Sequence, residues 1–222
     1  MEIKTIPITV YAESTPNPAT MKFVCNKLLI ENGATIEYTS PEAAKESELA
    51  SQIFNFPFVT GIFIAGNFIS VTKNNIVEWM DVTLDLREYI KEYLTSGKTV
   101  IKSQGSGVRS PETGHPASGG MSQPLRQPTS NAELVSELRT PNSELTQIEQ
   151  RIIELLEEYI RPAVEQDGGA IHFKSFESGV LKVVLRGSCS GCPSSTVTLK
   201  SGIQGLFARM LPEVTEVVAE EA

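Results

Sequence analysis

The sequence is poor in cysteine and in positive charge, and these two shortages exclude several classes of protein. Only 3 of the 222 residues are cysteine, too few and odd in number for a disulfide scaffold. The formal net charge is −8, whereas a nucleic-acid-binding protein needs a basic face to contact phosphates. No apolar run approaches the roughly 18 residues that a membrane-spanning helix needs. We therefore expect no nucleic-acid partner and no membrane partner.

The first residues also lack the features of a targeting sequence. The stretch "MEIKTIPITVY" has no basic segment followed by an apolar core, and it is not rich in Arg and Ser. An odd number of cysteines fits a compartment that keeps thiols reduced. Together these features predict a cytoplasmic protein.

A segment without aromatic residues divides the chain. Residues 103–140 are dense in Ser, Gly and Pro, and such a segment cannot bury enough apolar area to offset the entropy of ordering it. We therefore predict a flexible linker over 103–140 between two folded parts, residues 1–102 and 141–222. The mixture of strand and helix patterns in each part predicts two small α+β domains.

In the first part, strand alternation is clearest in "MKFVC". Met21, Phe23 and Cys25 fall on one side of the strand and Lys22 on the other, which indicates a half-buried strand. Free cysteine is among the most buried residue types, so we interpret Cys25 as a core residue and not a ligand.

Three further elements are expected in this part. A hairpin is predicted to turn at Gly66-Asn67, and helices are predicted over 41–54 and 82–94. The stretch "TPNP" at 15–18 predicts either a rigid turn or a loop that contacts a partner.

The second part has the pattern helix, strand, strand, helix (αββα). Thr146 and Glu149 form a capping box that opens the first helix, and Gly168 and Gly169 supply positive φ values for its exit. A hairpin follows, and the last helix is predicted to begin near Pro193.

The histidine of this hairpin is out of phase with its apolar neighbours. Ile171 and Phe173 share one face of the strand, so His172 is predicted to face solvent beside Lys174. Neither His172 nor His115, which lies in the predicted linker, is therefore a good metal ligand.

Cys189 and Cys192 form a Cys-x-x-Cys pair in the loop between a strand end and a helix start. Backbone N–H groups at a helix N-terminus stabilise thiolates and lower their pKa. The spacing places both sulfurs on one side of the loop, where they can bind a metal. We therefore take Cys189 and Cys192 as the candidate metal and cofactor ligands.

Three chemistries fit such a pair. A thiol–disulfide oxidoreductase uses two cysteines at this spacing, although usually in a different strand and helix context. A structural zinc site needs four ligands, and this domain offers no good third one. Alternatively, two copies of the domain bring four thiolates to one [4Fe–4S] cluster at a homodimer interface. A cluster shared in this way can leave without unfolding either domain, which suits a carrier better than an electron-transfer protein. We therefore expect a cluster carrier that is not itself an enzyme.

Two long stretches carry a family resemblance. "RPAVEQDGGAI" and "GSCSGCPSSTVTLKSGI" resemble the C-terminal NifU domain of the Nfu-type iron–sulfur carriers. "STPNPATMKFV" and "FPFVTGIFIAGNFISVTK" resemble the N-terminal domain of longer Nfu proteins. The sequence departs from the family at Ala170, where many relatives have a polar residue, and in its long linker.

The resemblance implies a function. A protein of this family accepts a [4Fe–4S] cluster from an upstream assembly scaffold and passes it to apo iron–sulfur proteins. The cysteines that match Cys189 and Cys192 are the cluster ligands in that family. The N-terminal domain contributes no ligand and contacts partners.

Overall fold

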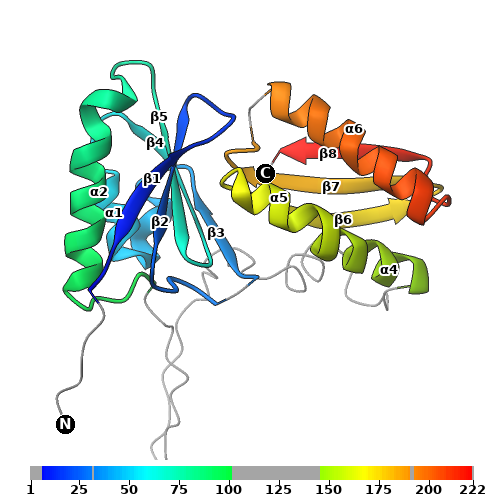
Figure 1. Ribbon diagram of the computed structural model, residues 1–222, viewed down its shortest axis with the longest axis horizontal. Helices are drawn as coiled ribbons and strands as arrows, with labels where there is room; N and C mark the ends of the chain where they lie inside the picture. Colours follow the sequence, from blue (N-terminus) through cyan, green and yellow to red (C-terminus); the bar gives the residue numbers. More distant parts are fainter. Residues whose placement is uncertain (1–6, 32, 102–145, 191–192, 222) are drawn as a thin grey trace, which may run out of the picture.

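A computed structural model describes residues 7–31, 33–101, 146–190 and 193–221. They form two α+β units, an N-terminal unit (7–101) and a C-terminal unit (146–221), each with its own apolar core (Figure 1). The predicted fold class is confirmed. The predicted linker lies outside the described residues, so its bounds and those of the two domains stay predictions.

The N-terminal unit is an antiparallel sheet with helices on one face. Its strands follow the order β1-β2-β5-β4-β3 in space, and every neighbouring pair is antiparallel. Helices α1 and α2 cover the face on the left in Figure 1. The elements are β1 (Val10–Ser14), β2 (Thr20–Cys25), β3 (Thr35–Tyr38), the 3-10 turn η1 (Ala43–Glu46), α1 (Glu48–Ile53), β4 (Val59–Ala65), β5 (Phe68–Lys73) and α2 (Trp79–Thr95).

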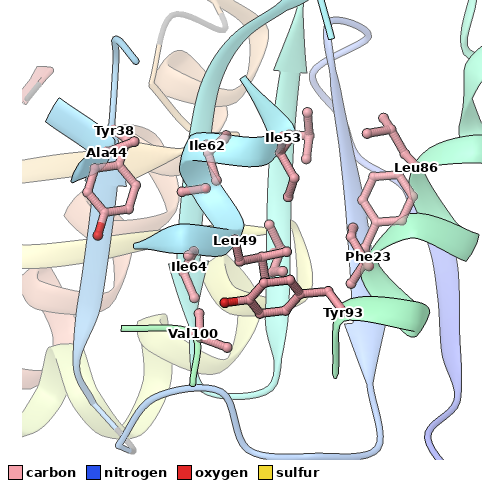
Figure 2. Packing of buried hydrophobic residues seen from close by; sticks show 14 of the residues in the cluster. Phe23, Tyr38, Ala44, Leu49, Ile53, Ile62, Ile64, Leu86, Tyr93 and Val100 are labelled. Atoms are coloured by element: carbon pink, nitrogen blue, oxygen red, sulfur yellow. The ribbon is translucent and has the colours of Figure 1, made fainter. Parts of the chain in front are cut away.

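The core of this unit lies between the sheet and its two helices. Figure 2 shows Leu49 of α1 and Leu86 of α2 among the strand side chains that include Phe23 and Ile62. The predicted hairpin is confirmed, since β4 and β5 are joined through Gly66, whose φ is 45°.

The two predicted helices of this unit are found with changed bounds. The helix expected at 82–94 is α2. The one expected at 41–54 is interrupted at Ser47, whose hydroxyl oxygen accepts a hydrogen bond from the Ala50 N–H at 3.1 Å and caps α1. A residue that caps a helix start has an extended backbone, and this separates η1 from α1.

The C-terminal unit places its helices on one face of a three-stranded sheet of order β6-β7-β8. Thr146 and Glu149 form the predicted capping box. Gly168 has a φ of 81° as expected, but Gly169 already begins β6 and has no positive φ. The elements are α4 (Gln147–Leu155), the π-helical segment η2 (Leu156–Ile160), α5 (Arg161–Gln166), β6 (Gly169–Glu177), β7 (Val180–Gly187), α6 (Pro193–Met210) and β8 (Glu216–Glu221).

Strand β8 is an addition to the predicted αββα order. It pairs with β7 in parallel, so that Leu181 lies opposite Val217. The sequence "EVVAEE" has three acidic residues in six and a short alternation, which gives a weak strand signal on its own. The strand is stabilised by burial of Val217 in the core that α6 covers.

The second face of the N-terminal sheet is covered by the C-terminal unit. Lys22 was expected to face solvent, but only 8% of it is exposed. Its Nζ donates a hydrogen bond to the Gln166 carbonyl at 3.2 Å. The expectation of a half-buried strand was therefore wrong for β2, because its polar side meets another folded unit (Figure 1).

Candidate metal centre

Cys189 lies in the turn between β7 and α6, as the sequence predicts. Gly187 ends β7 with a φ of 66°, and its carbonyl accepts a hydrogen bond from the Ser190 N–H at 3.1 Å. Helix α6 begins at Pro193. This tight turn directs the chain from the sheet into the helix, with the cysteine between them.

The turn is held against the start of β6. The Ser188 N–H donates to the Gly168 carbonyl at 3.2 Å, and the Ser188 hydroxyl donates to the Asp167 carbonyl. Gly169 pairs with Gly187 across the hairpin. Gly168 and Gly169, which follow α5, therefore support the turn that contains Cys189.

The sulfur of Cys189 is buried, with the residue 3% exposed, and it belongs to the apolar core. A Cβ placed on Gly169 would lie 2.7 Å from this Sγ, so the absence of a side chain at Gly169 makes room for the thiol. The Ser188 hydroxyl lies 4.0 Å from the same sulfur.

A cavity of about 280 Å³ adjoins this thiol. The described residues that line it come from α5, the cysteine turn, α6 and the N-terminal unit, and include Pro16, Ala163, Val164, Asp167, Cys189, Thr198 and Leu199. The space is large compared with the roughly 10–15 Å³ that a cavity needs to hold one water molecule. A buried thiol beside a cavity of this kind fits a bound metal group.

Cys192 lies outside the described residues, so the pairing of the two sulfurs stays a prediction. Within the ranges that the structure describes, no group of three or more His, Cys, Asp or Glu side chains is arranged to hold a metal ion. The described part of one chain therefore supplies no complete set of ligands around Cys189.

His172 is buried, which corrects the prediction that it faces solvent. It is 0% exposed, and its Nε2 lies 3.1 Å from Thr35 Oγ1 of the N-terminal unit. Burial lowers its pKa to about 3, and the charges of Arg186 and Arg161 act in the same direction. The ring is neutral and points to the face of the hairpin away from Cys189, so it remains unsuited as a third ligand.

Cys25 is a core residue, as predicted. It is 1% exposed within the N-terminal core, and burial raises the pKa of its thiol to about 12. Cys25 lies in a different apolar core from Cys189, so it is not part of the candidate centre.

The loop at 15–18 contacts the cysteine turn of its own chain. Asn17 Nδ2 donates a hydrogen bond to the Ser188 carbonyl at 3.2 Å, while Pro16 lines the cavity. Trp79 Nε1 donates to the Pro18 carbonyl at 3.0 Å and so fixes the loop to α2. The sequence indicated a rigid or contact-making loop but not that its target is the candidate centre.

The comparisons with known proteins match both units. Residues 10–97 match the family described as "Scaffold protein Nfu/NifU N terminal", and residues 152–218 match "NifU-like domain". A human protein named "NFU1 iron-sulfur cluster scaffold homolog, mitochondrial" is 32% identical over 209 residues, covering 94% of this chain and 70% of that protein. A Drosophila sechellia protein of the same name is 31% identical over 208 residues, covering 94% and 63%. This chain thus spans less than two thirds of the fly protein.

These names contradict the prediction of a cytoplasmic protein. Both relatives are named as mitochondrial. The cysteine content indicates only that thiols stay reduced, and a reducing environment does not identify one compartment. In the described parts of the chain, none of the helices is both long and apolar enough to span a bilayer.

Proposed function

Because the chain belongs to the Nfu/NifU family of iron–sulfur cluster scaffold proteins, we propose that Cys189 and Cys192 bind a [4Fe–4S] cluster. The family resemblance inferred from the sequence is confirmed by these matches. The observation that supports the site is the buried thiol of Cys189 beside its cavity, in a strand-to-helix turn. Cysteine thiolates are the usual ligands of such clusters.

The cluster is shared between two chains in this proposal. One chain supplies two thiolates, and a [4Fe–4S] cluster takes four. In a homodimer with two-fold symmetry the same loop faces its own copy, so the second pair of ligands comes from the partner. The lack of a third ligand in the described part of the chain supports this arrangement.

We propose that the protein carries the cluster and catalyses no reaction. It accepts the cluster from an upstream assembly scaffold and delivers it to apo iron–sulfur proteins. A cluster held at a two-fold interface can be released by separating the chains, without unfolding either C-terminal unit. The scaffold role in the names of the relatives supports this function.

Anaerobic reconstitution tests the proposal. The protein is incubated with iron, sulfide and a thiol reductant, and iron content, sulfide content and native mass are measured on one sample. We expect about four irons and four sulfides per dimer. Cys189→Ser and Cys192→Ser should each abolish binding, whereas Cys25→Ala, which removes a core thiol, should retain it.

Two results would contradict the proposal. A monomer that holds one zinc ion and no sulfide would identify a zinc site. Turnover in a disulfide-reduction assay, with a reversible Cys189–Cys192 disulfide in the monomer, would identify a thiol–disulfide oxidoreductase.

A further inference from the structure

The two units meet over the β6–β7 hairpin and at the turn that follows it. Among the described residues, hydrogen bonds that join the two units include five from side chains of the N-terminal unit to β6, β7 or the residues next to these strands. The pairs are Asn17 with the Ser188 carbonyl, Lys22 with the Gln166 carbonyl, Ser70 with the Gly168 carbonyl, Glu37 with the Gly187 N–H, and Thr35 with the His172 ring.

The Gly168 carbonyl connects this contact to the cysteine loop directly. It accepts a hydrogen bond from Ser70 Oγ at 2.6 Å and another from the Ser188 N–H at 3.2 Å. Ser188 is the neighbour of Cys189 in the chain. The N-terminal unit therefore shares an acceptor with the turn that positions the thiol.

Polar side chains of the N-terminal sheet are buried by this contact and find partners in it. Ser70 is 1% exposed and Lys22 is 8% exposed. Burying such groups costs free energy unless they are hydrogen-bonded. Lys22 also places a positive charge at the C-terminal end of α5, where the helix dipole favours it. The two surfaces are thus complementary in their polar groups.

An apolar cluster completes the contact. Ala170 of β6 packs among side chains of β2, β4 and β5, namely Val24, Phe63, Ala65 and Phe68. A Cβ on Gly187 would lie 2.9 Å from the Phe63 ring. The fit around the end of the β6–β7 hairpin is therefore close.

We infer that this contact is a closed, cluster-free form, in which the N-terminal unit occupies the surface that a second chain needs. Pro16 lines the cavity at Cys189, and Asn17 is hydrogen-bonded to Ser188. The inference rests on the proposed function, because it concerns the same shared cluster.

The two forms exclude one another for a geometric reason. Four thiolates reach one cluster only when two copies of the cysteine turn face each other at close range. The loop at 15–18 contacts the turn at Ser188 and lines the cavity at Cys189, so a second turn that approaches this thiol has to displace it. Cluster binding therefore opens the contact, and the N-terminal sheet face regains access to water.

Residues 102–145 join the two units, so both sides of the contact belong to one chain.

Lysine acetylation, read residue by residue by mass spectrometry, tests the inference on the full chain. Lys22 and Lys73 are both 8% exposed, but Lys22 is covered by the C-terminal unit. Lys73 lies over the Trp79 ring of its own unit. Lys22 should therefore report opening, and Lys73 should serve as the internal control. Lys27 is exposed and gives the acetylation rate of a solvent-accessible lysine.

Two variants should open the contact from opposite sides. Ser70→Arg places a charge against the Gly168 carbonyl, and Ala170→Glu places one in the apolar cluster. We expect Lys22 to be acetylated at least about tenfold faster in each, since burying an unpaired charge costs more than the 1.4 kcal/mol that this factor represents. Thr60→Arg adds the same charge at an exposed site of the same sheet and should change nothing.

A wild-type, cluster-free protein in which Lys22 reacts as fast as Lys27 would overturn the closed form. This test of the closed form uses the wild-type protein alone, so it does not depend on whether a variant folds. A reconstituted dimer should show fast Lys22 and unchanged Lys73. If Lys22 stays protected in a dimer that holds the cluster, the contact and the shared cluster can exist together. The inference is then wrong, while the proposed function stands. If no cluster binds, the proposed function fails, and the inference that rests on it fails as well.

Discussion

The hydroxyl of Thr35 lies 3.1 Å from Nε2 of His172, although 137 positions separate the two residues in the chain. The contact joins β3 of the N-terminal unit to β6 of the C-terminal unit. His172 is buried there with its pKa lowered to about 3. Since an ordinary histidine titrates near pH 6.5, this pair makes the fold sensitive to acid.

Acid should destabilise the protein through His172. Below pH 6.5 the His172 ring takes up a proton in the unfolded state but not in the folded state. The free energy of unfolding is therefore highest above that pH and falls as the pH drops toward 3. The loss between pH 7.5 and 5.5 should be about 1.4 kcal/mol. Urea unfolding at the two pH values measures it, with His172→Gln as the reference. This substitution keeps a group that can hydrogen-bond to Thr35.

The reference variant is needed because Glu37 acts in the opposite direction. Burial raises the pKa of this carboxyl, so protonation of Glu37 favours the folded state as the pH falls. The effect of Glu37 on the pH dependence of stability is present in both wild type and His172→Gln, so it cancels when the two are compared. Equal pH dependence in wild type and His172→Gln would show that His172 titrates normally.

The start of α4 should depend on the hydroxyl of Thr146. Thr146 accepts a hydrogen bond from the Glu149 N–H at 3.3 Å, and Glu149 accepts one from the Thr146 N–H at 2.8 Å. Thr146→Ala should lower the free energy of unfolding by about 1 kcal/mol, because the first turn loses its cap. Thr146→Ser keeps the hydroxyl and should stay within about 0.3 kcal/mol of wild type. Equal losses in both variants would exclude capping as the cause.

Cys25 should be unreactive in the folded protein. With a pKa of about 12, about one thiol in ten thousand is ionised at pH 8, and only the thiolate reacts with iodoacetamide. Peptide mapping should find Cys25 alkylated in urea and not in buffer. Alkylation in buffer at the rate seen in urea would show that the core of the N-terminal unit is open.

Local patterns predicted the elements that hold the candidate site. The alternation around Phe173 and Leu185 predicted the hairpin, and the capping box at Thr146 predicted the helix start. The position of Cys189 between a strand and a helix followed from these elements. Each of these features is set by neighbours in the sequence, which is why the sequence alone was enough.

The contact between the units could not be predicted in the same way. Lys22, Ser70 and His172 alternate with apolar residues, a pattern that ordinarily indicates a face in water. In this fold that face meets the other unit through polar pairs and through the apolar cluster around Ala170, and each of the three polar side chains finds a partner. Alternation shows which residues share a face but not what covers it. The loop at 15–18 was missed at the site for the same reason.

Room for the sulfur of Cys189 should depend on the absence of a side chain at Gly169. A Cβ there would lie 2.6 Å from the Arg186 carbonyl oxygen and 2.7 Å from Cys189 Sγ. Gly169→Ala must therefore displace the β6–β7 pairing or the thiol, and we expect a loss of about 1–3 kcal/mol. Iron and sulfide content after reconstitution should fall as well, because the ligand is moved from the turn that positions it.

Gly205→Ala is the matched control for this substitution. Gly205 lies inside α6, and a Cβ there meets nothing within 4 Å. Alanine is favoured over glycine in a helix interior, so this variant should be more stable by about 0.5–1 kcal/mol. Thermal unfolding of both variants separates the clash of the new methyl group at position 169 from the general effect of replacing glycine by alanine. If Gly169→Ala unfolds at the wild-type temperature and binds a full cluster, the space at Gly169 is not what positions the thiol.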